Sequence, residues 1–256
     1  PLTDYVNPLL GTATLWDSVD LGFKPTKRTW GAEVFPGSSL PNAMVQVSPV
    51  TKFHSGAGYQ YEDSVIYGFT HTNKGHWNLC HIPLLPVTGT PLPGDYCSPY
   101  SHARESAAPG YYRVFLDRYG VDVELTATKR VGLHKYTFPA SQEAAVVFDL
   151  ENGGCWDKAT ETAFVSDGLR LSGYRYSTGW AKDQRVYFTA EFSKPVKNIS
   201  YPDASETVPE EGDVTVKGRY ARVEFDTTDG EPLYMKVAIS PVSIENAKLN
   251  MQAELP

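Results

Sequence analysis

Apolar and polar side chains alternate strictly along residues 121–128, whose sequence is VDVELTAT. Successive side chains of a β-strand point to opposite faces, so this pattern is typical of a strand that packs one face on a core. The same two-residue period predicts further strands at residues 135–138, 145–150, 169–176, 185–192, 214–225 and 233–239.

Turn-forming residues separate these runs, with ENGG at 151–154, SDG at 166–168 and TDG at 228–230. Asn and Asp beside Gly favour tight turns. Because no helical pattern lies between the runs, they predict an antiparallel meander that closes into a sandwich. We therefore predict an all-β protein, a large antiparallel β-sandwich over residues 1–240.

The first hundred residues have a different character. Short strands are predicted at 44–47 and 65–70, and long loops rich in Pro, His and Trp lie around them. Loops of this composition on a rigid sheet are a frequent place for binding surfaces.

Helix-forming residues replace the alternation near the end of the chain, over residues 243–255. Ser243 is suited to cap the first turn of this helix. A single helix after a β-domain has little to pack against, so we interpret residues 241–256 as the start of a helical linker to a further domain.

Composition excludes several classes of function. The net charge is −7 and no basic cluster is present, which argues against nucleic-acid binding. No apolar run approaches 18 residues, so no membrane span is expected. The three Cys cannot all pair, although one disulfide remains possible, and they leave the compartment open.

The densest group of reactive side chains lies in residues 70–81, THTNKGHWNLCH. We favour a sugar subsite, because a Trp face packs on the C–H side of a pyranose while His, Asn and Lys bind its hydroxyls. The candidate contacts are His71, Asn73, Lys74, His76 and Trp77.

Two other chemistries remain open for the same segment, besides a polar loop whose His residues bond to backbone. His71, His76, Cys80 and His81 have suitable types for a metal, but their spacing matches no familiar zinc motif. Cys80 beside a His is also conceivable as a nucleophile, yet a structural Cys is the simpler interpretation.

The acidic residues do not form an obvious catalytic pair. Sugar hydrolysis usually needs two carboxyl groups that flank the bond. The main acidic cluster, at residues 203–213, lies in a Pro- and Ser-containing segment typical of a solvated loop. We therefore assign no catalytic residue and no metal ligand to this chain.

Several motifs together resemble the beginning of family 92 glycoside hydrolases, which are calcium-dependent, inverting exo-α-mannosidases. They cover most of the chain, in the family's order: YVNPLLGT at 5–12, FPG at 35–37, MVQVSP at 44–49, GYQY at 58–61, IYGFTHT at 66–72, LPVTG at 85–89, SHARE at 101–105, PGYY at 109–112 and LTAT at 125–128, with Arg130, Gly132 and His134.

This resemblance implies a two-domain enzyme. An amino-terminal supersandwich of the galactose-mutarotase type would be joined by a helical linker to an (α/α)6 barrel that holds the general acid, the general base and most of the calcium site. The sandwich would supply loops to the sugar pocket. Gly11 and Thr12 in the opening motif, and Trp180 in a loop between strands, become further candidate sugar contacts.

The family also suggests substrate and location. Where many relatives have a Ser-Gly-rich loop, this chain has NKGHWN at 73–78, so we hypothesise that His76 and Trp77 contact the leaving-group sugar of α-1,2-linked mannosides. The expected partners are mannose-containing glycans, including N-glycans under degradation, and the catalytic barrel. Bacterial relatives suggest a periplasmic, cell-surface or secreted protein.

Two alternatives to the enzyme interpretation remain: an autonomous carbohydrate-binding module without catalysis, and a purely structural partner domain.

Overall fold

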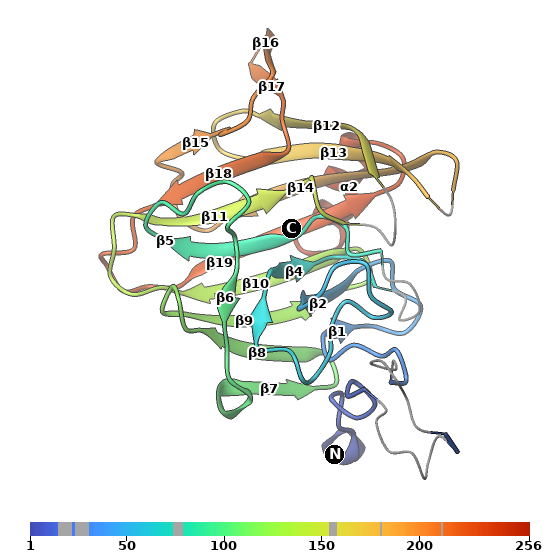
Figure 1. Ribbon diagram of the computed structural model, residues 1–256. Helices are drawn as coiled ribbons and strands as arrows, with labels where there is room; N and C mark the ends of the chain where they lie inside the picture. The colour runs from blue at the N-terminus through green and yellow to red at the C-terminus, as the bar shows by residue number, and fades with distance from the viewer. Residues whose placement is uncertain (15–21, 24–30, 74–78, 154–157, 180, 211) are drawn as a thin grey trace.

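The computed structural model describes residues 1–14, 22–23, 31–73, 79–153, 158–179, 181–210 and 212–256. Two large sheets face each other and enclose one hydrophobic core, and every strand pairing in them is antiparallel (Figure 1). The predicted all-β sandwich is thus confirmed.

The first sheet has seven strands among the described residues. In spatial order they are β1 (Ser38–Ser39), β2 (Gln46–Val50), β4 (Gly68–Thr70), β5 (Leu84–Thr88), β11 (Ala144–Asp149), β18 (Tyr220–Phe225) and β15 (Asn198–Ser200).

The second sheet has ten strands in the same described part of the chain. In spatial order they are β16 (Glu206–Glu210), β17 (Asp213–Lys217), β12 (Lys158–Ser166), β13 (Leu171–Thr178), β14 (Gln184–Phe192), β19 (Leu233–Ser240), β10 (Val131–Thr137), β9 (Val121–Ala127), β8 (Tyr111–Leu116) and β7 (Glu105–Ala108). Figure 1 shows the β16–β17 hairpin projecting from one end of the molecule.

The remaining described elements are small. β3 (Val65–Ile66) pairs with β6 (Ser98–Pro99), and two 3-10 turns lie at η1 (Leu2–Tyr5) and η2 (His102–Arg104). The helix α2 (Ile244–Glu254) follows the last strand.

Aromatic side chains join the two sheets. Phe148 of β11 stacks on Phe188 of β14 with 5.7 Å between ring centroids, and Phe225 of β18 lies 5.2 Å from Phe192 of β14. Phe148, Phe188 and Phe225 are fully buried. Offset aromatic pairs of this kind add to the free energy gained by burying their area, so they help fix one sheet over the other.

The alternating segments form strands as predicted, with one informative difference. Residues 214–225, expected as one strand, form β17 in the larger sheet and β18 in the smaller one. The chain changes sheets at Gly218 and Arg219, where the Asp203 carboxylate accepts the backbone N–H groups of Arg219 and Tyr220. The alternation of apolar and polar residues therefore continues from one strand into the next, and the sequence pattern alone does not show that the two strands belong to different sheets.

Strand β5 carries Pro86, which argues against a central strand because proline has no N–H to donate. Here β5 pairs with β11 from Leu84 to Thr88, but with β4 only at Leu84. Since the β4 ladder ends before Pro86, a missing donor is tolerated at this position.

The terminal helix has more to pack on than the sequence suggested. Ser243 caps α2 as predicted, its hydroxyl accepting the Asn246 N–H at 3.1 Å. Met251, only 3% exposed, packs on Val131 and Ala238 on the outer face of the larger sheet. The expectation that this helix lacks a surface within its own domain was therefore wrong.

Candidate functional site

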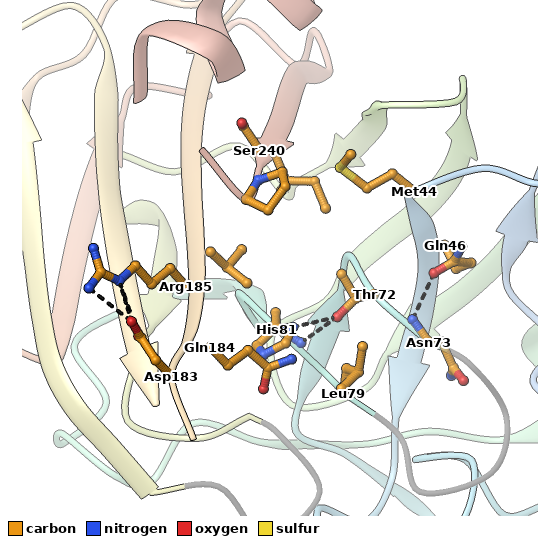
Figure 2. A pocket seen from close by; sticks show the side chains of 13 residues that line it. Met44, Gln46, Thr72, Asn73, Leu79, His81, Asp183, Gln184, Arg185 and Ser240 are labelled. Atoms are coloured by element: carbon orange, nitrogen blue, oxygen red, sulfur yellow. Dashed lines mark hydrogen bonds and ion pairs between the residues drawn. The ribbon is translucent and has the colours of Figure 1, made fainter. Parts of the chain in front are cut away.

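A cavity of about 550 Å³ opens where the start of β2 and the segments between β4 and β5 meet the start of β14 and the end of β19 (Figure 2). Its volume falls within the range of roughly 300–1,000 Å³ usual for small-molecule sites. It is lined by Met44, Gln46, Thr72, Asn73, Leu79, His81, Asp183, Gln184, Arg185, Val186, Ile239, Ser240 and Pro241.

His81 lies in the wall of this cavity with 1% of its surface exposed. The Thr72 hydroxyl oxygen accepts the His81 backbone N–H at 3.0 Å and also bonds to His81 Nδ1 at 2.9 Å. Burial lowers the pKa of His81 to about 3, and the positive charge of Arg175 acts in the same direction. The imidazole is therefore neutral at physiological pH, and its Nε2 has no hydrogen-bond partner.

The backbone on both sides of His81 is strained. Cys80 has φ 45° and Ile82 has φ 52°, in the left-handed region that non-glycine residues rarely adopt. For a β-branched residue such as Ile82 this conformation is an outlier, and such strain is concentrated at functional sites. It is held in place because the His71 N–H donates to the His81 carbonyl and the Cys80 N–H to the Thr72 carbonyl.

Two amide side chains near the cavity are fixed by the protein. The Gln46 carbonyl oxygen Oε1 accepts the Asn73 N–H at 2.9 Å, and Gln46 Nε2 donates to the Ala43 carbonyl. Asn73 Nδ2 donates to the Ala57 carbonyl at 2.8 Å. A third amide, Gln184, differs because its Oε1 is buried without a hydrogen-bond partner.

The charged residues in the lining neutralise each other. Asp183 and Arg185 form an ion pair at 2.9 Å, and both are exposed to solvent. The other described lining residues carry no charge, and apolar side chains lie between the polar ones: Met44, Leu79, Val186, Ile239 and Pro241. The described lining therefore suits an uncharged ligand that has both apolar faces and hydrogen-bonding groups.

Of the predicted sugar contacts, one lies in the described lining of the cavity. Asn73 lies in the cavity wall, and Figure 2 shows it beside Gln46. Lys74, His76, Trp77 and Trp180 fall outside the described residues. They stay predictions from the sequence.

His71 lies in the core, where both ring nitrogens have protein partners. Its Nδ1–H donates to the Ile82 carbonyl, and its Nε2 accepts a hydrogen bond from the Nε2–H of His134 at 2.9 Å. His134 Nδ1 in turn accepts the Tyr136 hydroxyl at 2.8 Å. Burial lowers the pKa of His71 to about 4 and that of His134 well below its usual value. In this arrangement His71 orders the interior and does not line the cavity.

Gly11 and Thr12 lie next to a second, much smaller cavity of about 10 Å³. That volume holds about one water molecule and is too small for a sugar. The Thr12 hydroxyl donates to the Leu9 carbonyl, and the Thr12 carbonyl accepts the Tyr61 N–H. These bonds give the opening motif a structural role in this part of the fold.

The metal and nucleophile interpretations gain nothing from the geometry. Among the described residues, no group of three or more His, Cys, Asp or Glu side chains could hold a metal ion. Cys80 and Cys97 form no disulfide.

No helix in the described part of the chain is long and apolar enough to cross a membrane.

Sequence reasoning did not select Gln184 or Gln46, and it considered His81 only as a metal ligand or base. A signal existed for Gln184, which occupies the same face of its strand as Val186 and Phe188. A polar residue in that register faces the interior. Gln46 carries no comparable signal in the sequence.

The structure is an antiparallel β-sandwich with a cavity of the size usual for small-molecule sites. Residues 5–240 match the profile of the glycosyl hydrolase family 92 N-terminal domain, and the chain belongs to this family. The resemblance seen in the motifs is thereby confirmed. A search of curated proteins finds no match.

Solved structures agree with this assignment. The chain is similar to the family GH92 α-mannosidase BT3965 from Bacteroides thetaiotaomicron, solved alone and in complex with mannoimidazole, with TM-score 0.82 and 30% identity over 98% of this chain. It is also similar to the GH92 inverting mannosidase BT2199 from the same organism, with TM-score 0.77 and 26% identity over 99% of this chain. The chain spans 34% and 33% of those two proteins.

Proposed function

We propose that this chain is the sugar-facing β-sandwich of an exo-acting α-mannosidase that degrades mannose-containing glycans. The observation that carries the proposal is the cavity at the end of the sandwich, whose described lining combines apolar and polar groups without a net charge, in a chain of this hydrolase family. The mannosidases among its structural neighbours support the choice of mannose as the sugar.

The cleavage step requires residues from elsewhere. Inverting hydrolysis uses two carboxyl groups about 6.5–9.5 Å apart, with room for a water between them and the sugar. The described lining contains one carboxylate, Asp183, which is already bound by Arg185. We therefore assign the general acid and base to a barrel domain, joined to the sandwich through α2, and expect the bond to be broken with inversion.

Calcium does not fit the described residues. A Ca²⁺ site needs six to eight oxygen ligands, usually with several carboxylates. The described part of the cavity offers one carboxylate, which is ion-paired. Among all described residues, no group of three or more His, Cys, Asp or Glu side chains could hold a metal ion. Any calcium in the complete enzyme is thus proposed to be held by the catalytic domain, and none of the roles given to this chain depends on it.

The loop 74–78 remains our candidate for recognition of the leaving-group sugar. Asn73 and Leu79 flank it, and both line the cavity. In the complete enzyme, Trp77→Ala should raise KM for α-1,2-mannobiose while leaving α-mannosyl fluoride unaffected, because fluoride offers no ring to stack in the leaving-group position. Equal KM changes on both substrates would remove Trp77 from this role.

The activity itself is tested with the complete enzyme and the 256-residue chain side by side. The complete enzyme should release β-mannose first from α-1,2-mannobiose, as followed by proton NMR, and should lose activity on calcium chelation. The chain alone should release none. Hydrolysis by the chain alone, or no hydrolysis of any α-mannoside by the complete enzyme, would contradict the proposal.

A carbohydrate-binding module without catalysis is the second candidate. The favouring observation is that thirteen described residues of this chain line the cavity. A complete protein that binds mannosides but hydrolyses none would select this candidate. For either function we propose a periplasmic, cell-surface or secreted location, which cell fractionation tests.

A further inference from the structure

Two buried polar atoms around the cavity lack hydrogen-bond partners. They are His81 Nε2 and Gln184 Oε1, and both residues line the cavity (Figure 2). Burying a polar group without a partner is costly, so native proteins rarely retain such a group without a use for it.

His81 is held in a fixed position. Its backbone and Nδ1 are both bonded to Thr72, and strained residues flank it on either side. With the Thr72 hydroxyl oxygen accepting the backbone N–H, its hydrogen can donate to Nδ1, which leaves Nε2–H as a donor. In the other tautomer Nδ1–H donates to Thr72, and Nε2 becomes an acceptor. A hydroxyl group satisfies either state, because it both donates and accepts.

Gln184 restricts the ligand further. Its Oε1 only accepts, so the partner must bring a donor hydrogen. A carboxylate or phosphate would place negative oxygen against this acceptor, and a cation would find Asp183 already paired with Arg185. A neutral molecule with several hydroxyl groups meets all of these conditions.

The polar character extends along the neighbouring strand. The interior-facing positions of β13 begin with buried Leu171 and end with buried Arg175 and Ser177. Arg175 Nε donates across the sandwich to the Leu150 carbonyl, and Ser177 is paired in register with Gln184. The interior-facing side of β13 thus changes from apolar to polar toward the end that pairs with Gln184.

We propose that His81 Nε2 and Gln184 Oε1 are direct contacts for hydroxyl groups of a mannose residue bound in this cavity. The inference deepens the proposed function and rests on it for the identity of the sugar. It places sugar recognition in the wall of the sandwich itself.

The test is calorimetric titration of the 256-residue chain with methyl α-D-mannoside, comparing wild type, His81→Phe and Gln184→Met. Gln142→Met is the matched control, because Gln142 is exposed and remote from the cavity lining. Gln184→Met should weaken binding at least about fivefold, because a sugar hydroxyl then loses its acceptor. Its melting temperature should stay the same or rise, since an unpaired polar atom is removed. If His81→Phe fails to fold, the affinity of Gln184→Met alone tests the inference.

Absence of binding by the wild-type chain, or equal affinities of wild type and Gln184→Met, would overturn the inference. Either result is separable from failure of the proposed function. A complete enzyme that hydrolyses α-mannosides with the same KM in wild type and Gln184→Met retains the function without these contacts. A complete enzyme that hydrolyses none loses the function, whatever the chain binds.

Discussion

Three buried histidines show how single residues shape this fold. His71, His81 and His134 are neutral because burial lowers the pKa of each. Their neutral rings can both donate and accept, which lets His71 and His134 join the two sheets, while Nε2 of His81 is buried without a hydrogen-bond partner. Protonation of these rings inside the protein would break the bonds that hold them.

Stability should therefore fall as the pH is lowered from 7 to 5. In the unfolded chain each His titrates near 6.5, so protons bind the unfolded state first. At pH 5 a His with a folded pKa of about 4, such as His71, costs about 2 kcal/mol. Asp149 opposes this change, because burial raises its pKa to about 6, but it offsets only about 1 kcal/mol.

Urea unfolding at the two pH values measures the balance. We expect a free energy of unfolding at least about 2 kcal/mol lower at pH 5, since three histidines outweigh one carboxyl group. A constant or rising free energy of unfolding would show that these rings already carry protons in the folded state.

The element that most changes the picture is α2. The helix is attached to the larger sheet by buried Met251 and by Glu254, whose carboxylate accepts the backbone N–H and Nε–H of Arg130. Lys236 Nζ also donates to the Leu255 carbonyl. A helix held at both its apolar face and its last turn has a fixed direction relative to the larger sheet.

Removing the apolar anchor should destabilise the domain. Met251→Ala should lower the free energy of unfolding by about 2–3 kcal/mol, because it leaves a cavity against Val131 and Ala238. Gln252→Ala, at an exposed neighbouring position, should change it by less than about 0.5 kcal/mol. Chemical denaturation measures the free energy of unfolding of both variants. Equal effects of the two substitutions would mean that α2 does not pack on the larger sheet through Met251.

At the scale of the whole molecule, the sequence predicted the sandwich better than the cavity. Strands with one buried face have a local two-residue period, which made β9, β14 and β19 predictable. β12 was missed because its first half, Lys158–Thr162, is exposed or only partly buried and lacks alternation. The cavity was beyond local reasoning, because residues as distant in sequence as Gln46, His81 and Gln184 meet only after the two sheets pack.

The central claim is that this cavity binds sugar hydroxyl groups through His81. Long-range ¹⁵N–¹H NMR of the histidine rings reports hydrogen bonding at each nitrogen directly. On titration with methyl α-D-mannoside, the His81 Nε2 resonance should shift saturably while both nitrogens of buried His134 stay unchanged. A sugar that leaves the His81 Nε2 resonance unmoved at saturating concentration would contradict the account.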